Sequence, residues 1–258
     1  MHLAEAFIAG LLVAAVTTPA GVSGAVLLLP IQVSLLDVPS PAVTPTNLIF
    51  NLFATPSGVL RYRRLRRGTS RSPLVARLLA GTIPGVVVGA IIRVEWLSGQ
   101  RAFYLAAALV LAVLGGLLIR RRADHAAGQL PLPLIPPIAL GVGVIGGIYG
   151  IGGGSFLAPI LLIGGYTAYE VAPAALLSTM AASIVGVAAF VILGMTSSST
   201  APVTPDWGIG ITAGIGGVLG AYVGAGVQSR IPDARLRRLL GLIALAIAIR
   251  YLDLALTG

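Results

Sequence analysis

Ten apolar stretches follow one another along this chain, with little sequence between them. They lie at about 4–19, 22–36, 42–60, 74–93, 102–120, 134–149, 151–165, 169–194, 207–227 and 238–256. About 20 helical residues cross a hydrocarbon core of roughly 30 Å, so most of these stretches are long enough to span a bilayer. Charged residues make up only 10% of the 258 residues, against about 25% in soluble domains. The sequence therefore predicts an all-α, polytopic membrane protein.

Several kinds of chemistry are excluded by composition. There is no cysteine, and His2 and His125 stand apart from any cluster of metal-ligating residues. There is also no lysine, which the nucleotide-binding motif GxxxxGK[ST] requires. No nucleophile and base are paired within the apolar stretches. We therefore expect no enzyme, no metal and no cofactor.

The basic residues indicate orientation. All 17 are arginines, and the net charge of +9 gathers in short connections between apolar stretches. This pattern is typical of the positive-inside rule, and we expect contact with membrane lipid and no nucleic-acid partner. Seven arginines lie from Arg61 to Arg77, three at Arg120–Arg122 and four from Arg230 to Arg238, whereas 195–206 has none.

Ten crossings would place all three arginine clusters on the cytoplasmic side and both termini outside. Re-entrant segments at 22–36 and 151–165, each about 15 residues long, are the alternative. Treating these two segments as re-entrant predicts that the last arginine cluster lies outside, so the charge rule favours ten crossings. The first stretch lacks a basic leader, which predicts a retained helix rather than a signal peptide. The expected location is the inner (plasma) membrane of a bacterium, as a multi-pass protein.

The chain repeats itself at a nearly constant offset. Positions of one half recur 129 or 128 residues later with the same residue type: Gly21, Gly24, Pro30, Val43, Pro45, Leu48 and Gly58 match Gly150, Gly153, Pro159, Val171, Pro173, Leu176 and Gly186. Five segments per half is an odd number, so the second half would enter the membrane from the opposite side. We expect two inverted repeats, at 1–125 and 126–258, an architecture common in secondary transporters.

Two glycine-rich breaks occupy matching places in the halves: PAGVSGAVLLLP at 19–30 and GGIYGIGGGSFLAP at 146–159. Non-helical backbone at membrane depth survives only inside protein or beside a cavity. The short helix after each break begins with free N–H groups and a positive dipole end, which suit an anion. The candidate binding residues at the breaks are Gly21, Ser23, Gly24, Gly150, Gly152, Gly153, Gly154 and Ser155.

A second polar group follows each break. Thr46, Asn47 and Asn51 are candidates in the first half, and Thr179 and Ser183 carry the same interpretation in the second. The alternative is that these groups only hydrogen-bond neighbouring helices. Spaced glycines are a different case, and we expect helix packing from two sets: Gly81, Gly85 and Gly89, and Gly216, Gly220 and Gly224.

The acidic residues fall in loops or near segment ends. Glu170 is the nearest candidate for proton coupling, although stabilisation of a helix N-terminus is the stronger interpretation. Arg250, close to the end of the last stretch, is expected to snorkel.

The segment GIYGIGGGSFLAPILLIGGYTAYEVAPAALLSTMAASIVGVAAF resembles the signature of the TauE/SafE family of membrane permeases, and 20–68 is similar to its first-half counterpart. The chain departs from the family pattern in two places. The first glycine-rich turn has fewer glycines, and Ala174–Ala175 occupy the positions in the second half that correspond to Thr46–Asn47. The resemblance implies transport of small anions, often sulfur-containing, such as sulfite, sulfonates and sulfoacetate-like compounds.

We therefore expect a secondary carrier for a small-molecule anion, bound between the two breaks and moved by alternating access. Export is favoured, because no acid for coupling lies at membrane depth and an anion leaves a negative cell downhill. The alternatives are an anion channel, and an importer of a small carboxylate or other organic anion coupled to a cation. A homodimer is a further expectation.

Overall fold

The computed structural model describes residues 2–18, 23–65, 73–120, 129–196, 202–227 and 233–257. Across these ranges the structure is helical and contains no strand. The helices are α1 (His2–Thr17), α2 (Ala25–Ser34), α3 (Val43–Leu65), α4 (Pro73–Glu95), α5 (Gln100–Arg120), α6 (Ile135–Tyr149) with the preceding 3-10 turn η2 (Leu132–Leu134), α7 (Gly154–Ile163), α8 (Ala168–Thr196), α9 (Trp207–Val227) and α10 (Asp233–Thr257). Their order and approximate bounds confirm the ten predicted helices.

Six of the helical segments are long and apolar enough to cross a membrane, judged over the described residues. They are Pro73–Glu95, Gln100–Ile119, Leu132–Tyr149, Pro173–Thr196, Trp207–Gly224 and Arg238–Thr257. Their outer faces carry exposed aliphatic side chains, Leu109, Ile192 and Ile249 among them. Exposing such an apolar surface to water would cost free energy, whereas in a membrane the lipid chains surround it. The chain is therefore a multi-pass membrane protein.

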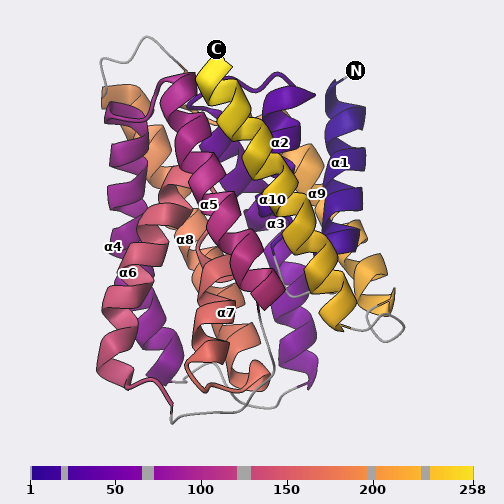
Figure 1. Ribbon diagram of the computed structural model, residues 1–258, viewed down its shortest axis with the longest axis vertical. Helices are drawn as coiled ribbons and strands as arrows, with labels where there is room; N and C mark the ends of the chain where they lie inside the picture. Colours follow the sequence, from indigo (N-terminus) through magenta and orange to yellow (C-terminus); the bar gives the residue numbers. More distant parts are fainter. Residues whose placement is uncertain are drawn as a thin grey trace.

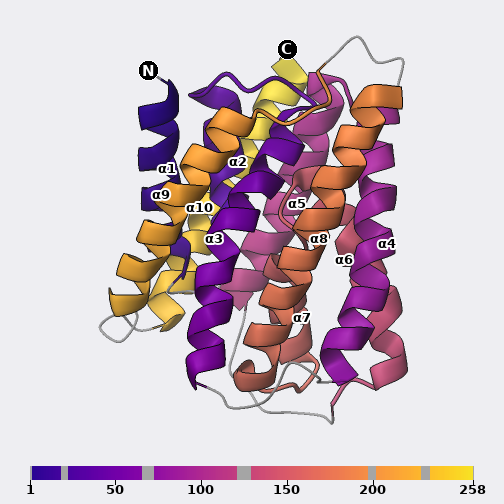
Figure 2. The ribbon, with the colours of Figure 1, turned by 180° about the vertical axis from the view of Figure 1, so that it is seen from behind.

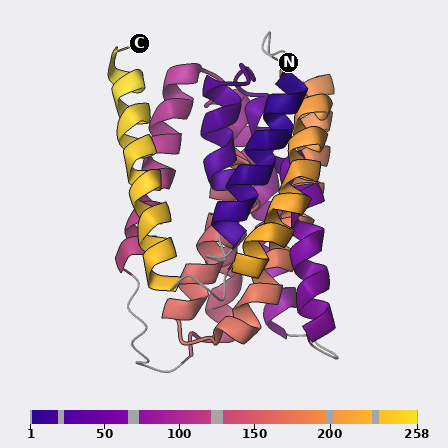
Figure 3. The same ribbon diagram turned by 90° about the vertical axis from the view of Figure 1, so that its right-hand side faces the viewer.

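The two short helices turn back instead of crossing. From the end of the bundle that carries both termini, α1 runs to about mid-height and α2 returns to the same end (Figures 1 and 3). From the opposite end, α6 and α7 make the same excursion in reverse (Figure 1). Helices α2 and α7 have 10 residues each, or about 15 Å, half of the hydrocarbon thickness.

The expectation of ten crossings is therefore wrong, and so is its argument from charge. Each hairpin starts and ends on one side, as two full crossings do. The C-terminal ends of α3, α5 and α9 and the N-terminal ends of α4 and α10 accordingly all lie at one end of the bundle (Figure 1). These ends adjoin the arginine clusters, so the predicted sidedness does not depend on full crossings.

Helix packing pairs the two halves of the chain. The closest pairs are α4 with α6, α1 with α9, and α5 with α10. Helices α3 and α8 lie against each other at the centre, with α9 also on α3 and α4 also on α8 (Figure 2). Exchanging α1–α5 for α6–α10 maps each of these pairs onto another pair of the set or onto itself.

Both glycine sets lie in these tight contacts. A methyl group at Gly216, Gly220 or Gly224 would overlap backbone oxygens of α1, and one at Gly81, Gly85 or Gly89 would overlap those of α6. The predicted packing role of the two sets is confirmed. Small residues here allow the backbones to approach, and the close packing that results is one of the sources of helix association in lipid.

Glu170, in the second half of the chain, forms hydrogen bonds with a residue three positions before it. The Glu170 carboxylate accepts hydrogen bonds from Thr167 N–H (3.0 Å) and Thr167 Oγ1 (2.7 Å), while Glu170 N–H donates to Thr167 Oγ1 (3.3 Å). This capping box starts α8 and confirms the stabilising interpretation of Glu170. Burial and the Glu170 carboxylate raise the pKa of Tyr166, whose hydroxyl donates to Leu130 O.

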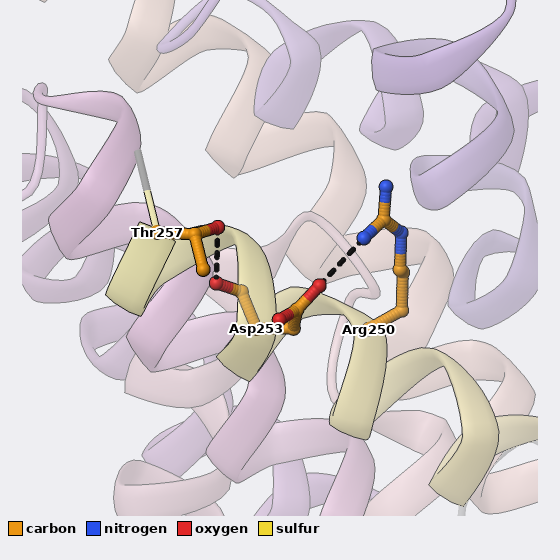
Figure 4. A network of polar contacts seen from close by, with 3 residues as sticks. All are labelled: Arg250, Asp253 and Thr257. Carbon is orange, nitrogen blue, oxygen red and sulfur yellow. Dashed lines mark hydrogen bonds and ion pairs between the residues drawn. The ribbon is translucent and has the colours of Figure 1, made fainter.

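Near the end of α10, Arg250 forms a 2.6 Å ion pair with Asp253 one turn later (Figure 4). Thr257 Oγ1 donates to the backbone oxygen of Asp253 over 2.8 Å, which closes the same turn (Figure 4). Both charged side chains are more than half exposed. Arg250 therefore lies near the helix end and also forms an ion pair with an acidic side chain there.

Candidate functional site

The tip of the α6–α7 hairpin is a left-handed turn built from glycine. Gly150 ends α6 with φ 78°, and Gly152 and Gly153 follow with φ 66° and 85°. An L-residue pays roughly 1–2 kcal/mol for each such conformation, so glycine is what allows the chain to reverse here. A methyl group at Gly152 would also lie 2.8 Å from Thr179 Cγ2 and 3.0 Å from Ser183 Oγ. The glycines therefore bring bare backbone against α8.

This turn presents N–H groups to the protein interior. Gly154 N–H donates to Thr179 Oγ1 over 3.0 Å, which caps α7 from α8. In the described part of the chain, the N–H groups of Gly152, Gly153 and Ser155 donate to no acceptor. Three donors at the positive end of a helix dipole form the kind of site that holds an anion.

The two hairpin tips meet. Ser23 N–H, just before α2, donates to Ser155 Oγ in the first turn of α7 over 3.2 Å, although the residues are 132 apart in sequence. Asn51 of α3 joins both tips, because its Oδ1 accepts from Ser23 Oγ (2.7 Å) and its Nδ2 donates to Gly150 O (3.4 Å). The two sequence breaks thus form one polar site inside the bundle.

Two buried polar atoms beside this junction have no partner. Asn47 Nδ2 donates to Ala25 O over 2.8 Å, which leaves Asn47 Oδ1 unpaired, and Ser183 Oγ is also unpaired. The amide cannot be turned over, since its oxygen would then face the Ala25 oxygen. Both residues have no exposed surface. Buried polar atoms normally find partners, so orphans gathered at a helix break indicate a place for a ligand or water.

Most predicted site residues come together here. Hydrogen bonds or close contacts join Ser23, Asn47, Asn51, Gly150, Gly152, Gly154, Ser155, Thr179 and Ser183 around the two tips, with Gly153 as the N-cap of α7. Gly24 caps α2 and lies against the Phe50 ring. Gly21 lies outside the described residues.

Thr46 is placed elsewhere. Its hydroxyl donates to Ala42 O (2.8 Å) and accepts Asp206 N–H (2.9 Å), so it fastens the start of α3 to the segment before α9. Neighbouring helix positions point about 100° apart, which explains why Thr46 leaves the site that Asn47 joins.

Sequence reasoning missed four features. Thr44 Oγ1 donates to Ile148 O near the hairpin tip (3.1 Å), and Thr82 shares a 2.8 Å hydrogen bond with Ser178 across α4 and α8. Gln32 of α2 is wholly buried with both amide atoms unpaired. Arg93 of α4 is also wholly buried, and its signal was its position: a lone arginine in an apolar stretch, away from the three clusters.

The described part of the site contains no acidic or basic side chain in contact with the tips, and no group of three His, Asp or Glu residues that could hold a metal occurs among the described residues. Two hairpins that end at mid-height, with the N-terminal ends of their short helices joined by the hydrogen bond from Ser23 to Ser155, define the class of membrane proteins with broken helices and an internal polar site.

Within that class the chain belongs to the family described as Sulfite exporter TauE/SafE, whose sequence profile matches residues 6–251. The match covers both hairpins and all ten helices in whole or in part, and it confirms the resemblance of the glycine-rich segments. No curated protein matches the sequence.

Proposed function

We propose that the protein is a secondary transporter that carries a small sulfur-containing anion, an oxyanion such as sulfite or an organosulfonate, bound between the tips of the α1–α2 and α6–α7 hairpins. The observation that carries this proposal is the hydrogen bond from Ser23 N–H to Ser155 Oγ, with unpaired N–H groups, the unpaired Ser183 hydroxyl and the unpaired Asn47 Oδ1 around it. It joins the two breaks inside the bundle. Membership of the TauE/SafE family supports the anion class.

The donor set favours an anion of single charge. The site offers N–H and O–H groups and a helix N-terminus, which carries about half an elementary positive charge. No cationic side chain contacts the tips in the described residues. Such a site compensates one negative charge better than two, since the cost of burying charge rises steeply with its size. Hydrogensulfite and alkylsulfonates fit this requirement better than sulfate.

The two halves, 1–125 and 126–258, act in this proposal as inverted repeats. Support comes from the helix pairs, which exchange with one another when α1–α5 replace α6–α10, and from hairpins that enter from opposite ends. Rocking of one half against the other would open the central site to each side in turn. A monoanion leaving a cell that is negative inside gains about 2.3 kcal/mol per 100 mV, so export needs no coupling ion.

Ligand-induced stabilisation tests the site. The purified protein is heated with hydrogensulfite, methanesulfonate, acetate and sulfate at equal ionic strength. A ligand at about 100 times its Kd raises the free energy of unfolding by about 2.7 kcal/mol. We expect the sulfur monoanions to raise the Tm, and Ser183→Ala to weaken that rise more than it changes the Tm without anion. Equal effects of all four anions on both proteins would contradict the proposed site.

A further inference from the structure

Arg93 is a buried cation without a counter-charge. It lies in the last turn of α4, and its side chain has no exposed surface. Its Nε donates to Thr44 Oγ1 (3.0 Å), its Nη2 to Ser40 Oγ (2.6 Å) and its Nη1 to Leu97 O. The guanidinium also lies over the Phe103 ring, with Cζ 4.3 Å from the ring centre.

All these partners are neutral. Among the described residues, no carboxylate lies within ion-pair distance of Arg93, and three of its five N–H groups are used. A buried charge without an opposite one is expensive, and a neutral side chain could tie the same loops together. A bound anion would therefore compensate the buried charge of Arg93, which no carboxylate of the described residues does.

A pocket lies next to Arg93. It has a volume of about 300 Å³ and is lined by Val33, Asp37, Ser40, Ser98, Gln100 and Phe103, among others. Ser40 and Phe103 both line the pocket and contact the guanidinium, so they connect Arg93 to the pocket. The pocket opens where α2 ends and α5 begins, at the end of the bundle that carries both termini and faces away from the arginine clusters (Figure 1).

Arg93 also reaches toward the central site. Thr44, which accepts from Nε, donates to Ile148 O two residues before the Gly150 turn. Thr44 lies one helical turn before Asn47 on α3 and shares its face. One guanidinium therefore contacts a residue of the outer pocket, Ser40, and also Thr44, which hydrogen-bonds to the C-terminal end of α6.

We propose that this pocket and Arg93 form a second anion subsite, on the outer side, through which the anion passes between the hairpin tips and the exterior. An oxyanion or sulfonate in the pocket would take the Nη groups of Arg93 in place of Ser40, because a guanidinium binds such oxygens in a planar, two-point geometry. Asp37, exposed at the rim, opposes anion entry and limits retention there. The nature of the transported anion rests on the proposed function, whereas the positive potential of the pocket does not.

The natural absence of cysteine permits a direct test. In Ser98→Cys, a near-isosteric change in the pocket lining, the new thiol is labelled from the outside of proteoliposomes with an anionic reagent, sulfonatoethyl methanethiosulfonate, and a cationic one, the trimethylammonioethyl analogue. We expect the ratio of anionic to cationic rates to fall about tenfold when Arg93→Gln is added, the size of a focused field effect. The matched control is Arg101→Gln, which removes an exposed arginine of α5 and should leave the ratio nearly unchanged.

Equal effects of Arg93→Gln and Arg101→Gln on the ratio would overturn the subsite. If Arg93→Gln does not fold, labelling of Ser98→Cys with Arg93 intact decides the matter: sulfate or methanesulfonate should slow the anionic reagent saturably, and no protection by either would refute the inference. Sulfite flux is measured in parallel with the otherwise unchanged protein. Its absence would refute the proposed function, whereas normal saturable flux with an Arg93-independent labelling ratio would refute only the subsite.

Discussion

Gly152→Ala adds only a methyl group, yet it should lower the free energy of unfolding more than the same change at Gly153, its neighbour in the hairpin tip. The φ of 66° costs an alanine roughly 1–2 kcal/mol. The methyl group would lie 2.8 Å from Thr179 Cγ2 and 3.0 Å from both Thr179 O and Ser183 Oγ, and overpacking of this kind typically costs about 1–3 kcal/mol. The two effects sum to about 2–5 kcal/mol of unfolding free energy.

Two other glycines separate these effects. Gly153 has a φ of 85° but more room, because Thr82 Cγ2 lies 3.4 Å from where an added methyl group would be. Gly153→Ala should therefore cost only the backbone strain of roughly 1–2 kcal/mol. Gly141, inside α6, has no atom within 4 Å of an added methyl, so Gly141→Ala should be neutral or stabilise by up to about 1 kcal/mol.

The assay is thermal unfolding of the three purified variants in one detergent, with and without hydrogensulfite. From the highest Tm to the lowest, the expected order is Gly141→Ala, Gly153→Ala and Gly152→Ala. Gly152→Ala should also lose the anion-induced rise in Tm, because its methyl group lies against Ser183. If Gly152→Ala unfolds at the temperature of Gly141→Ala and responds equally to the anion, the geometry described for the tip is wrong.

Three further changes test separate contacts. Thr179→Val leaves the buried Gly154 N–H without its acceptor and should cost about 1–3 kcal/mol in unfolding assays; an unchanged Tm would exclude this cap. Gly220→Ala presses a methyl group on Leu11 O and should lower the Tm while the anion-induced rise persists; loss of that rise would place Gly220 in the site. Thr167→Ala removes the cap of α8 and should cost about 0.5–2 kcal/mol, with sulfite KM unaffected; a changed KM would argue against a purely structural role.

The helices were predictable because lipid imposes them. Apolar length gave the ten segments, and glycine spacing gave the packing role of the two glycine sets, whose partner helices, α1 and α6, only the structure shows. The glycine run at 150–154 also located the hairpin tip, since consecutive glycines have few other uses at depth. Local sequence carries these features, so no tertiary information was needed.

The remainder depends on tertiary arrangement. Hairpins and full crossings give the same sidedness, so charge could not distinguish them. Thr46 and Asn47 are neighbours in sequence, yet one helical step turns Thr46 toward Asp206 and Asn47 toward Ala25. Arg93 looked like the end of an apolar stretch, because its burial comes from the 35–42 and 96–99 segments and from α5, which no periodicity in α4 reveals.

The central claim, that the hairpin tips bind an anion which the protein then carries across the membrane, is tested most directly by counterflow in proteoliposomes. Vesicles loaded with unlabelled sulfite should take up labelled sulfite transiently, with saturation, and methanesulfonate inside should drive the same exchange. Asn51, which joins both tips, should be essential, so Asn51→Leu should abolish counterflow while Gly141→Ala retains it. Flux that is linear in concentration would indicate a channel, and no saturable flux of any sulfur anion would contradict the account.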